Sequence, residues 1–239
     1  MVQLFADGAD FNGIVEASKN EKITGFTTNP TLMRQAGVDN YTEFAHKVLT
    51  FLSENRPKTS ISLEVFADDF DEMYTQAKTI SQWGKDHNYS VFVKIPITNT
   101  KKHTSYDLIK SLSKDNVQLN ITAIFTQEQV ENVLDNVNTE TENIVSVFAG
   151  RIADAGVDPV PVMEDVVFAC RHFFNVKTLW ASPREVLNFI QADQVGCDII
   201  TMTPDLIKKL GNIGKNLNQY SLETVQMFYN DAIKSGYKI

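Results

Sequence analysis

The stretch that decides the fold reads Ser90-Val91-Phe92-Val93-Lys94-Ile95-Pro96-Ile97-Thr98. It is a short apolar run rich in β-branched residues, which predicts a buried β-strand. Side chains alternate across a strand, so the aliphatic residues share one face while Phe92, Lys94 and Pro96 share the other. A lysine inside such a strand costs free energy unless its pKa falls or it finds a partner.

Lys94 allows two interpretations on the evidence of this strand alone. A lysine near a strand end can lay its stem along apolar surface and keep its ammonium group in water. Alternatively, a buried amine is a nucleophile that forms a Schiff base with a carbonyl compound. The rest of the chain has to decide between the two.

The composition is that of a globular protein. The chain has 239 residues, a length at which an α/β barrel often forms one domain. The net charge of −8 argues against nucleic acid as a partner. Residues 1–7 lack the features of a signal peptide, and no apolar run is long enough to span a membrane. We therefore expect a cytoplasmic protein with neither a membrane nor a nucleic-acid partner.

The cysteines and histidines show no metal-site spacing. Cys170 and Cys197 lie in apolar surroundings and are expected to be buried thiols instead of a disulfide. The four histidines are expected to be structural or to lie on the surface: His46, His87, His103 and His172. We expect no metal site and no cofactor.

Strand-like runs alternate along the chain with amphipathic, helix-like segments. The predicted strands are 2–7, 25–29, 60–66, 91–97, 118–125, 144–150, 177–182 and 198–202. The predicted helices are 41–54, 70–88, 106–115, 127–136, 160–174, 183–192 and 204–210. Eight strands alternating with helices predict an α/β fold in which residues 1–239 form a single (β/α)8 TIM barrel.

The segment 222–237 predicts one more helix after the barrel. Its apolar residues recur at helical spacing: Leu222, Val225, Phe228, Tyr229, Ala232 and Ile233. Because such an apolar stripe has to be buried, this helix is expected to pack either on its own barrel or on a neighbouring subunit.

Strand parity places polar side chains inside the predicted barrel. In each strand the aliphatic face suits the helix layer, and the opposite face carries Asp7, Asn29, Glu64, Lys94, Asn120, Thr122 and Ser146. By the same parity, Phe148 shares a face with Ser146, and Trp180 with Ser182. Barrel interiors are normally apolar, so these polar groups need one another around a site. A lysine among carboxylates and hydroxyls suits imine chemistry, because carboxylates shuttle protons and hydroxyls hold a water molecule.

These segments resemble the transaldolase family, which also contains fructose-6-phosphate aldolase. The resemblance rests on 5–7 (FAD), 25–31 (GFTTNPT), 93–98 (VKIPIT), 119–125 (LNITAIF), 146–151 (SVFAGR) and 181–184 (ASPR). They follow the family's order over nearly the whole chain, and TTNP, VKIPIT and NITAIF are the most specific of them. The length resembles the short form of the family.

The resemblance implies a metal-free class I mechanism, with a Schiff base on Lys94 and with Asp7 as general acid and base. Glu64 and Thr122 would position the catalytic water. The implied substrate-binding residues are Thr27, Asn29, Asn120, Ser146, Phe148, Arg151, Ser182 and Arg184, the last three at the substrate phosphate. Guanidinium groups also suit bidentate phosphate binding on physical grounds. The resemblance further implies a homo-oligomer, a ring of five subunits or two stacked rings, in which the last helix reaches a neighbour.

Two positions bear on the branch of the family. Glu64 is an acid where the aldolase branch has glutamine, and Phe148 stands where that branch has a tyrosine that can donate a proton. These residues favour transfer of a dihydroxyacetone unit between sugar phosphates, in the pentose phosphate pathway, over release of free dihydroxyacetone. Gly8 and Pro183 depart from the family's usual residues, and Pro183 fixes the backbone beside Arg184.

Other interpretations stay open at this point. The chain can be an aldolase that releases free dihydroxyacetone from fructose 6-phosphate, or a sugar-phosphate-binding barrel without catalysis. Among single residues, Asn29 before Pro30 is also a turn signal, and Ser146 is also a small packing residue. Arg151 and Arg184 have acidic neighbours in sequence and can form exposed ion pairs of little energetic value.

Overall fold

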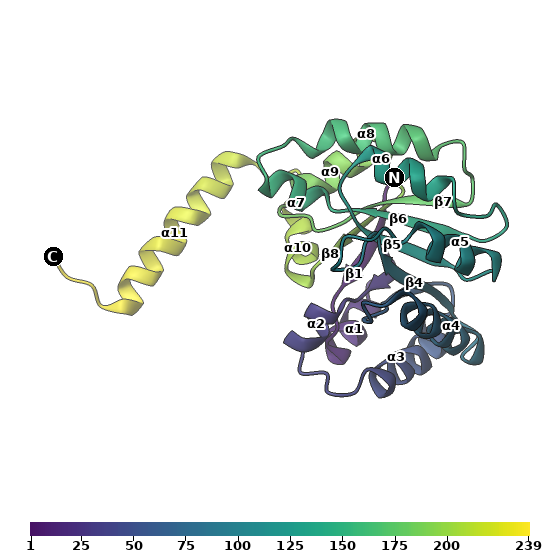
Figure 1. Ribbon diagram of the computed structural model, residues 1–239. Coiled ribbons are helices and arrows are strands. Elements are labelled where there is room, and N and C mark those ends of the chain that lie inside the picture. Colours follow the sequence, from purple (N-terminus) through teal and green to yellow (C-terminus); the bar gives the residue numbers. More distant parts are fainter.

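Eight parallel strands close into a barrel in the computed structural model, which describes residues 1–239 (Figure 1). The strands are β1 Gln3–Asp7, β2 Ile23–Thr27, β3 Ser60–Glu64, β4 Ser90–Pro96, β5 Leu119–Ile124, β6 Asn143–Val147, β7 Val176–Trp180 and β8 Ile199–Met202. Each strand pairs with its neighbours in the chain, and β8 closes the barrel on β1. The predicted (β/α)8 barrel is confirmed.

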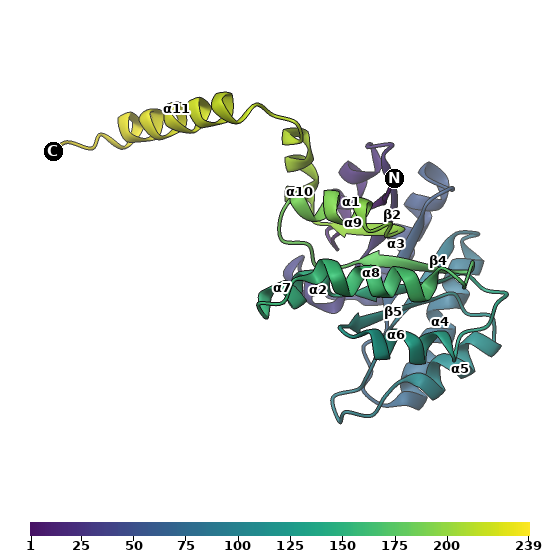
Figure 2. The ribbon, with the colours of Figure 1, turned by 90° about the horizontal axis from the view of Figure 1, so that it is seen from above.

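The chain has eleven α-helices, and all but the last surround the barrel (Figures 1 and 2). They are α1 Phe11–Ser18, α2 Pro30–Gln35, α3 Tyr41–Asn55, α4 Phe70–Asp86, α5 Tyr106–Lys114, α6 Gln127–Leu134, α7 Ala149–Asp154, α8 Pro159–Cys170, α9 Leu187–Gln194, α10 Pro204–Lys209 and α11 Leu217–Ser235, with a 3₁₀ turn at Leu210–Asn212. The sequence pattern missed the short helices α1, α2 and α7. Two of these have cap signals: the Asp10 and Asn29 side chains accept hydrogen bonds from the backbone N–H groups of Gly13 and Leu32.

The apolar residues form two separate cores. The larger core lies between the barrel and the helices, and it contains the aliphatic face of β4, including Val91, Val93 and Ile95. The smaller core fills the barrel interior and consists of Phe5, Phe92, Ile144, Leu179, Ala181 and Ile199. The interior is thus apolar in its lower part, and its polar residues gather towards the carboxyl ends of the strands, where barrel sites lie.

Several predicted element boundaries differ from the structure, and three of them lie close to the site or change a helix by four residues. The predicted strand 144–150 ends at Val147, and α7 begins at once with Ala149. The predicted helix 183–192 begins only at Leu187, because the Asn188 side chain holds the preceding loop by accepting hydrogen bonds from the backbone N–H groups of Arg184 and Glu185. The predicted helix 160–174 ends at Cys170 in a turn that leaves Phe174 exposed.

Trp180 faces the helix layer, so its predicted inward orientation is wrong. Leu179 of β7 and Ala181, directly after the strand, point into the barrel, and Trp180 lies in the outer core. Strand parity does not apply to Ser182, because this residue lies outside the strand. Its positive φ of 60° turns it back towards the site.

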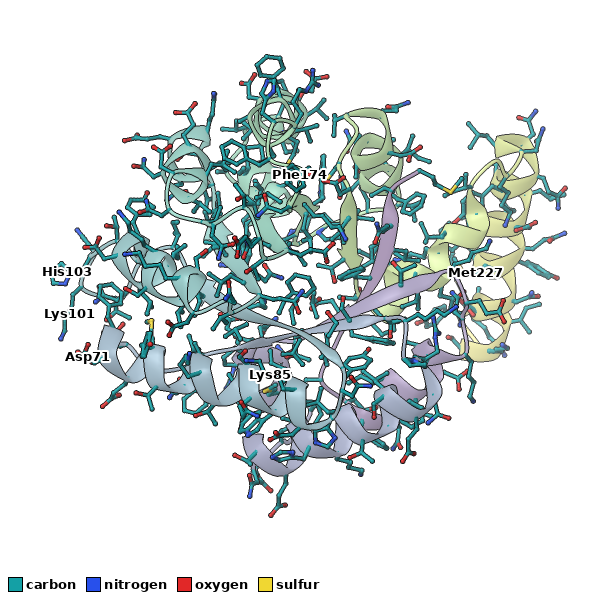
Figure 3. The ribbon with its side chains drawn as sticks, turned by 90° about the vertical axis from the view of Figure 1, so that its right-hand side faces the viewer. Asp71, Lys85, Lys101, His103, Phe174 and Met227 are labelled. Atoms are coloured by element: carbon teal, nitrogen blue, oxygen red, sulfur yellow. The ribbon has the colours of Figure 1, made fainter.

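The last helix, α11, stands apart from the barrel. It runs from Leu217 to Ser235, so it begins five residues before the predicted 222–237, and none of its residues is buried. Both views show it projecting into solvent, and Figure 3 marks it by Met227. Its apolar stripe remains uncovered, since Val225, Phe228 and Ile233 are each about 60% exposed.

The cysteines are free and buried, as predicted. Burial raises the pKa of the Cys170 thiol to about 12 and that of Cys197 to about 11, so both are protonated and unreactive at neutral pH. His46 Nδ1 lies 2.9 Å from His87 Nε2 between α3 and the end of α4, whereas His103 points into solvent (Figure 3). No helix combines the length and the apolar character needed to cross a membrane.

Candidate active site

A cavity of about 120 Å³ opens at the carboxyl ends of the strands. It is lined by Asp7, Thr27, Asn29, Lys94, Asn120, Thr122, Ser146, Phe148, Arg151, Leu179, Ala181, Ser182 and Thr201. A cavity of this size and polarity suits a small hydroxylated group of about three carbon atoms.

Lys94 extends from β4 into this cavity and is only 7% exposed. Its ammonium nitrogen lies 3.0 Å from Glu64 Oε2 and donates a hydrogen bond of 3.0 Å to the carbonyl oxygen of Thr28. The strand register explains the pair, because Lys94 stands beside Glu64 where β4 pairs with β3. The buried lysine therefore has a partner that neutralises its charge and that is close enough to accept its proton.

Asp7 ends β1 on the far side of the cavity mouth from β4. Its Oδ1 accepts a 2.7 Å hydrogen bond from the hydroxyl of Thr27, which ends the adjacent strand β2. Burial raises the pKa of Asp7 above its ordinary value, and the positive charge of Lys94 and the Thr27 hydrogen bond oppose that rise. The carboxyl group is therefore able to exchange a proton nearer to neutral pH than an exposed aspartate.

A second hydrogen-bonded chain crosses the barrel interior at the wall of the cavity. The Ser146 hydroxyl donates to Asn120 Oδ1 at 2.6 Å, and Asn120 Nδ2 donates to the hydroxyl of Ser62 at 3.0 Å. All three side chains are buried. The chain uses the hydroxyl hydrogen of Ser146, so Ser146 can offer lone pairs to a ligand hydroxyl. Nearby, the buried Thr122 hydroxyl has no hydrogen-bond partner in the protein.

Arg151 and Arg184 have different environments. Arg151 lies in α7, lines the cavity and sits with its guanidinium carbon 5.3 Å from the centre of the Phe148 ring. Arg184 forms a bidentate ion pair with Asp154, in which its Nε donates to Asp154 Oδ1 at 3.1 Å and its terminal nitrogen to Oδ2. Both members of this pair are about half exposed. Of the two arginines that the sequence allowed to form an exposed ion pair, Arg184 does so. Its partner is Asp154 and not Glu185, its neighbour in sequence.

Gly150 holds α7 against the loop after β7. Its backbone N–H donates to the carbonyl oxygen of Ala181 at 3.3 Å. A Cβ atom at this position would lie 1.5 Å from the backbone carbonyl oxygen of Ser182, far inside contact distance. Only glycine therefore allows the close approach that brings Arg151 and Ser182 to the same cavity.

Replacement of Gly150 by alanine is expected to displace the Ser182 loop and to destabilise the protein by about 1–3 kcal/mol, as overpacking does. Chemical denaturation measures the free energy of unfolding. Gly211→Ala is the matched control, because a Cβ there meets no atom within 4 Å. Equal stability of the two variants would mean that the loop yields to the methyl group without strain.

Most of the predicted site residues meet at this cavity. Glu64 contributes through its contact with Lys94, and Arg184 is held at the rim by Asp154. Sequence reasoning missed Thr201, although its inward parity in β8, opposite Ile200 and Met202, is a signal that could have revealed it. The carbonyl oxygen of Thr28 carried no such signal, because it is a backbone atom.

Comparisons with known proteins bear on the family and the fold of the chain. The model of a family described as Transaldolase/Fructose-6-phosphate aldolase matches residues 4–239. A probable transaldolase from Dehalococcoides mccartyi is 32% identical over 202 residues, which cover 84% of this chain and 86% of that protein. A probable transaldolase from Thermoanaerobacter sp. is 27% identical over the full length of both chains. A crystal structure of KGPDC from Streptococcus mutans shares the fold, with a TM-score of 0.55 and 12% identity over 85% of this chain and 88% of that one.

Proposed function

Because the chain belongs to the transaldolase/fructose-6-phosphate aldolase family, we propose that it is a class I transaldolase. It transfers a dihydroxyacetone unit from a ketose phosphate, such as sedoheptulose 7-phosphate or fructose 6-phosphate, to an aldose phosphate. This reaction belongs to the pentose phosphate pathway, in the cytoplasm. The observation that carries the proposal is the buried Lys94–Glu64 pair at the cavity, with its 3.0 Å separation.

Imine formation begins with the proton of Lys94. The amine attacks the ketose carbonyl only after it has lost a proton, and Glu64 is within reach to accept it. Attack gives a carbinolamine, and protonation of its hydroxyl releases water and leaves a cationic imine. The unpartnered hydroxyl of Thr122 supports a role in holding the water that carries these protons.

Carbon–carbon cleavage needs a base, and Asp7 fits that role. The carboxylate removes the proton from the substrate's C4 hydroxyl, the C3–C4 bond breaks, and its electron pair moves into the imine to form an enamine. The first aldehyde leaves. When the acceptor aldehyde enters, the enamine carbon attacks its carbonyl carbon, and Asp7 returns the proton to the new hydroxyl group.

The remaining three-carbon unit has to stay in the cavity between these steps. The cavity of about 120 Å³ suits this unit, and Asn29, Asn120 and Ser146 offer partners for its hydroxyl groups. Asn29 also caps α2, since its Oδ1 accepts a hydrogen bond from the backbone of Leu32, so it serves the fold at the same time.

Arg151 and Ser182 are proposed to bind the substrate phosphate, together with Arg184 after it leaves Asp154. Replacement of either arginine by alanine is expected to raise KM for phosphorylated substrates about 10- to 100-fold, the loss of a charged hydrogen bond. Steady-state kinetics with phosphorylated substrates and unphosphorylated analogues measures the difference.

Asp154→Asn is the matched variant for this test. It weakens the competing ion pair of Arg184, so KM for phosphorylated substrates is expected to fall in this variant. If both arginine variants lose activity equally on phosphorylated and unphosphorylated substrates, the arginines are structural and not phosphate ligands.

The uncovered apolar stripe of α11 is proposed to pack on a neighbouring subunit of a homo-oligomer. The proposed homo-oligomer is a ring of five subunits or two stacked rings. Removal of residues 217–239 is expected to lower the mass measured by light scattering, because the exposed apolar residues of α11 lie clear of their own barrel. Phe228→Glu should lower the mass as well, whereas Asn230→Glu, off the stripe, should not. An unchanged mass after the deletion would contradict this role of α11.

The proposed function is tested with sedoheptulose 7-phosphate and glyceraldehyde 3-phosphate. Transfer of three carbons gives fructose 6-phosphate and erythrose 4-phosphate, which coupled enzymes or mass spectrometry detect. We expect product to form only when both substrates are present. Binding of these sugars without turnover would support the non-catalytic alternative, and rapid formation of free dihydroxyacetone would support the aldolase.

A further inference from the structure

The hydroxyl of Thr201 extends the hydrogen bond between Thr27 and Asp7 into a chain of three side chains. The Thr201 hydroxyl lies 2.5 Å from the hydroxyl of Thr27, which in turn lies 2.7 Å from Asp7 Oδ1. We propose that Thr201 is a positioning residue for the transfer reaction, which acts through Thr27 to fix and polarise the carboxylate of Asp7. The proposal rests on the function proposed above for Asp7.

The barrel topology brings the three residues together. Strand β1 lies between β2 and β8, and Asp7 is in register with Thr27 on one side, while Phe5 is in register with Thr201 on the other. Thr27 and Thr201 are both buried, with 2% and 6% exposure. The two hydroxyls therefore meet next to Asp7, at the wall of the cavity.

Counting protons fixes the direction of the chain. A threonine hydroxyl has one hydrogen to donate and two lone pairs to accept with. Ionised Asp7 can only accept, so Thr27 gives its hydrogen to Asp7 Oδ1. The short bond between the threonines then requires Thr201 to donate to Thr27. The chain runs from Thr201 through Thr27 to Asp7, and it leaves Oδ2 of Asp7 free of protein hydrogen bonds and available to a substrate hydroxyl.

Hydrogen bonds in a chain polarise one another, so a donor to Thr27 makes Thr27 a better donor to Asp7. The charged or titratable groups that act on Asp7 are Lys94 from β4 and Glu64 from β3. Burial and Glu64 raise the pKa of Asp7, and Lys94 and Thr27 lower it. Thr201 belongs on the lowering side, because it stabilises the ionised form through Thr27.

Thr201→Val tests the inference, because valine has nearly the shape of threonine and lacks the hydroxyl. In protein labelled with ¹³C-aspartate, the carboxyl carbon of Asp7 is assigned by its absence in Asp7→Asn and titrated by NMR. We expect a higher pKa of Asp7 in Thr201→Val than in wild type. The acid limb of the kcat profile should move to higher pH, and kcat at neutral pH should fall roughly tenfold, the order of one lost hydrogen bond.

Two further variants separate positioning from packing. Thr201→Ser keeps the hydroxyl and should restore the wild-type pKa and pH profile. Thr178→Val removes a buried hydroxyl from the adjacent strand β7, where it binds Asp198 at 2.9 Å, and should leave both unchanged.

Two results would overturn the inference: an unchanged Asp7 titration in Thr201→Val, or a serine variant that behaves like the valine variant. Should the valine variant not fold, Thr201→Ala replaces it in the same comparison with serine. Because the NMR titration does not depend on turnover, it tests Thr201 even if wild-type protein transfers no sugar, a result that would overturn the proposed function instead.

Discussion

Replacement of Lys94 by methionine is expected to abolish transfer activity while the barrel remains folded. Methionine has a similar length and suits the buried position, but it has no nitrogen with which to form an imine. Lys94→Arg is expected to be inactive as well, because it keeps the charge next to Glu64 and lacks a nucleophilic amine. The measurements are kcat for transfer and the circular dichroism spectrum of each variant.

The methionine variant also has a predictable stability cost. It leaves the carboxylate of Glu64, whose side chain is only 17% exposed, without its cation, which is expected to destabilise the protein by about 3 kcal/mol. Adding Glu64→Gln removes the unpaired charge and should recover much of that stability without recovering activity. Activity that survives in Lys94→Met would show that another group carries the chemistry. Because the proposed class I mechanism needs no metal ion, EDTA should leave the wild-type rate unchanged.

Replacement of Phe148 by tyrosine is expected to convert part of the transfer activity into release of free dihydroxyacetone. Phe148 lines the cavity in which the proposed mechanism forms an enamine on Lys94. A phenol hydroxyl can donate a proton to an enamine, directly or through water, and a phenyl ring cannot. Once protonated on carbon, the intermediate is hydrolysed and can no longer attack an acceptor.

The size of this effect follows from the proton donor. A positioned general acid typically contributes about 10²–10⁴-fold, so even a poorly placed tyrosine should raise the release rate measurably. Adding Glu64→Gln should raise it further, since glutamine can donate a hydrogen bond to a water where carboxylate only accepts. The assay is free dihydroxyacetone formed from fructose 6-phosphate without an acceptor. Many turnovers by the wild type under these conditions would assign the chain to the aldolase alternative.

Strand parity was sufficient to predict the centre of the site. Lys94, Glu64 and Asp7 belong to regular strands, where alternation fixes the side-chain direction, and the structure brings Lys94 and Glu64 within 3.0 Å of each other. The same reasoning failed where the chain leaves a strand. Trp180 was placed on the wrong face because Ser182, used to set the parity, has left-handed backbone geometry.

The rim of the site depends on contacts between residues far apart in sequence. The pairing of Arg184 with Asp154 joins the loop after β7 to the end of α7, and local patterns carry no information on such partners. The requirement for glycine at position 150 is likewise set by the carbonyl oxygen of Ser182, which only the folded chain brings close. Helix α11 was predicted, but its amphipathic pattern does not reveal that it stands apart from its own barrel.

Borohydride trapping tests the central claim most directly. Wild-type protein is incubated with fructose 6-phosphate and sodium borohydride, which reduces an imine to a stable secondary amine, and the digested protein is mapped by mass spectrometry. We predict a single modified peptide, with the added mass of the reduced six-carbon donor imine or of the reduced three-carbon unit on Lys94. Modification of a different lysine, or no adduct in protein that actively transfers the dihydroxyacetone unit, would contradict the proposal that Lys94 forms the Schiff base.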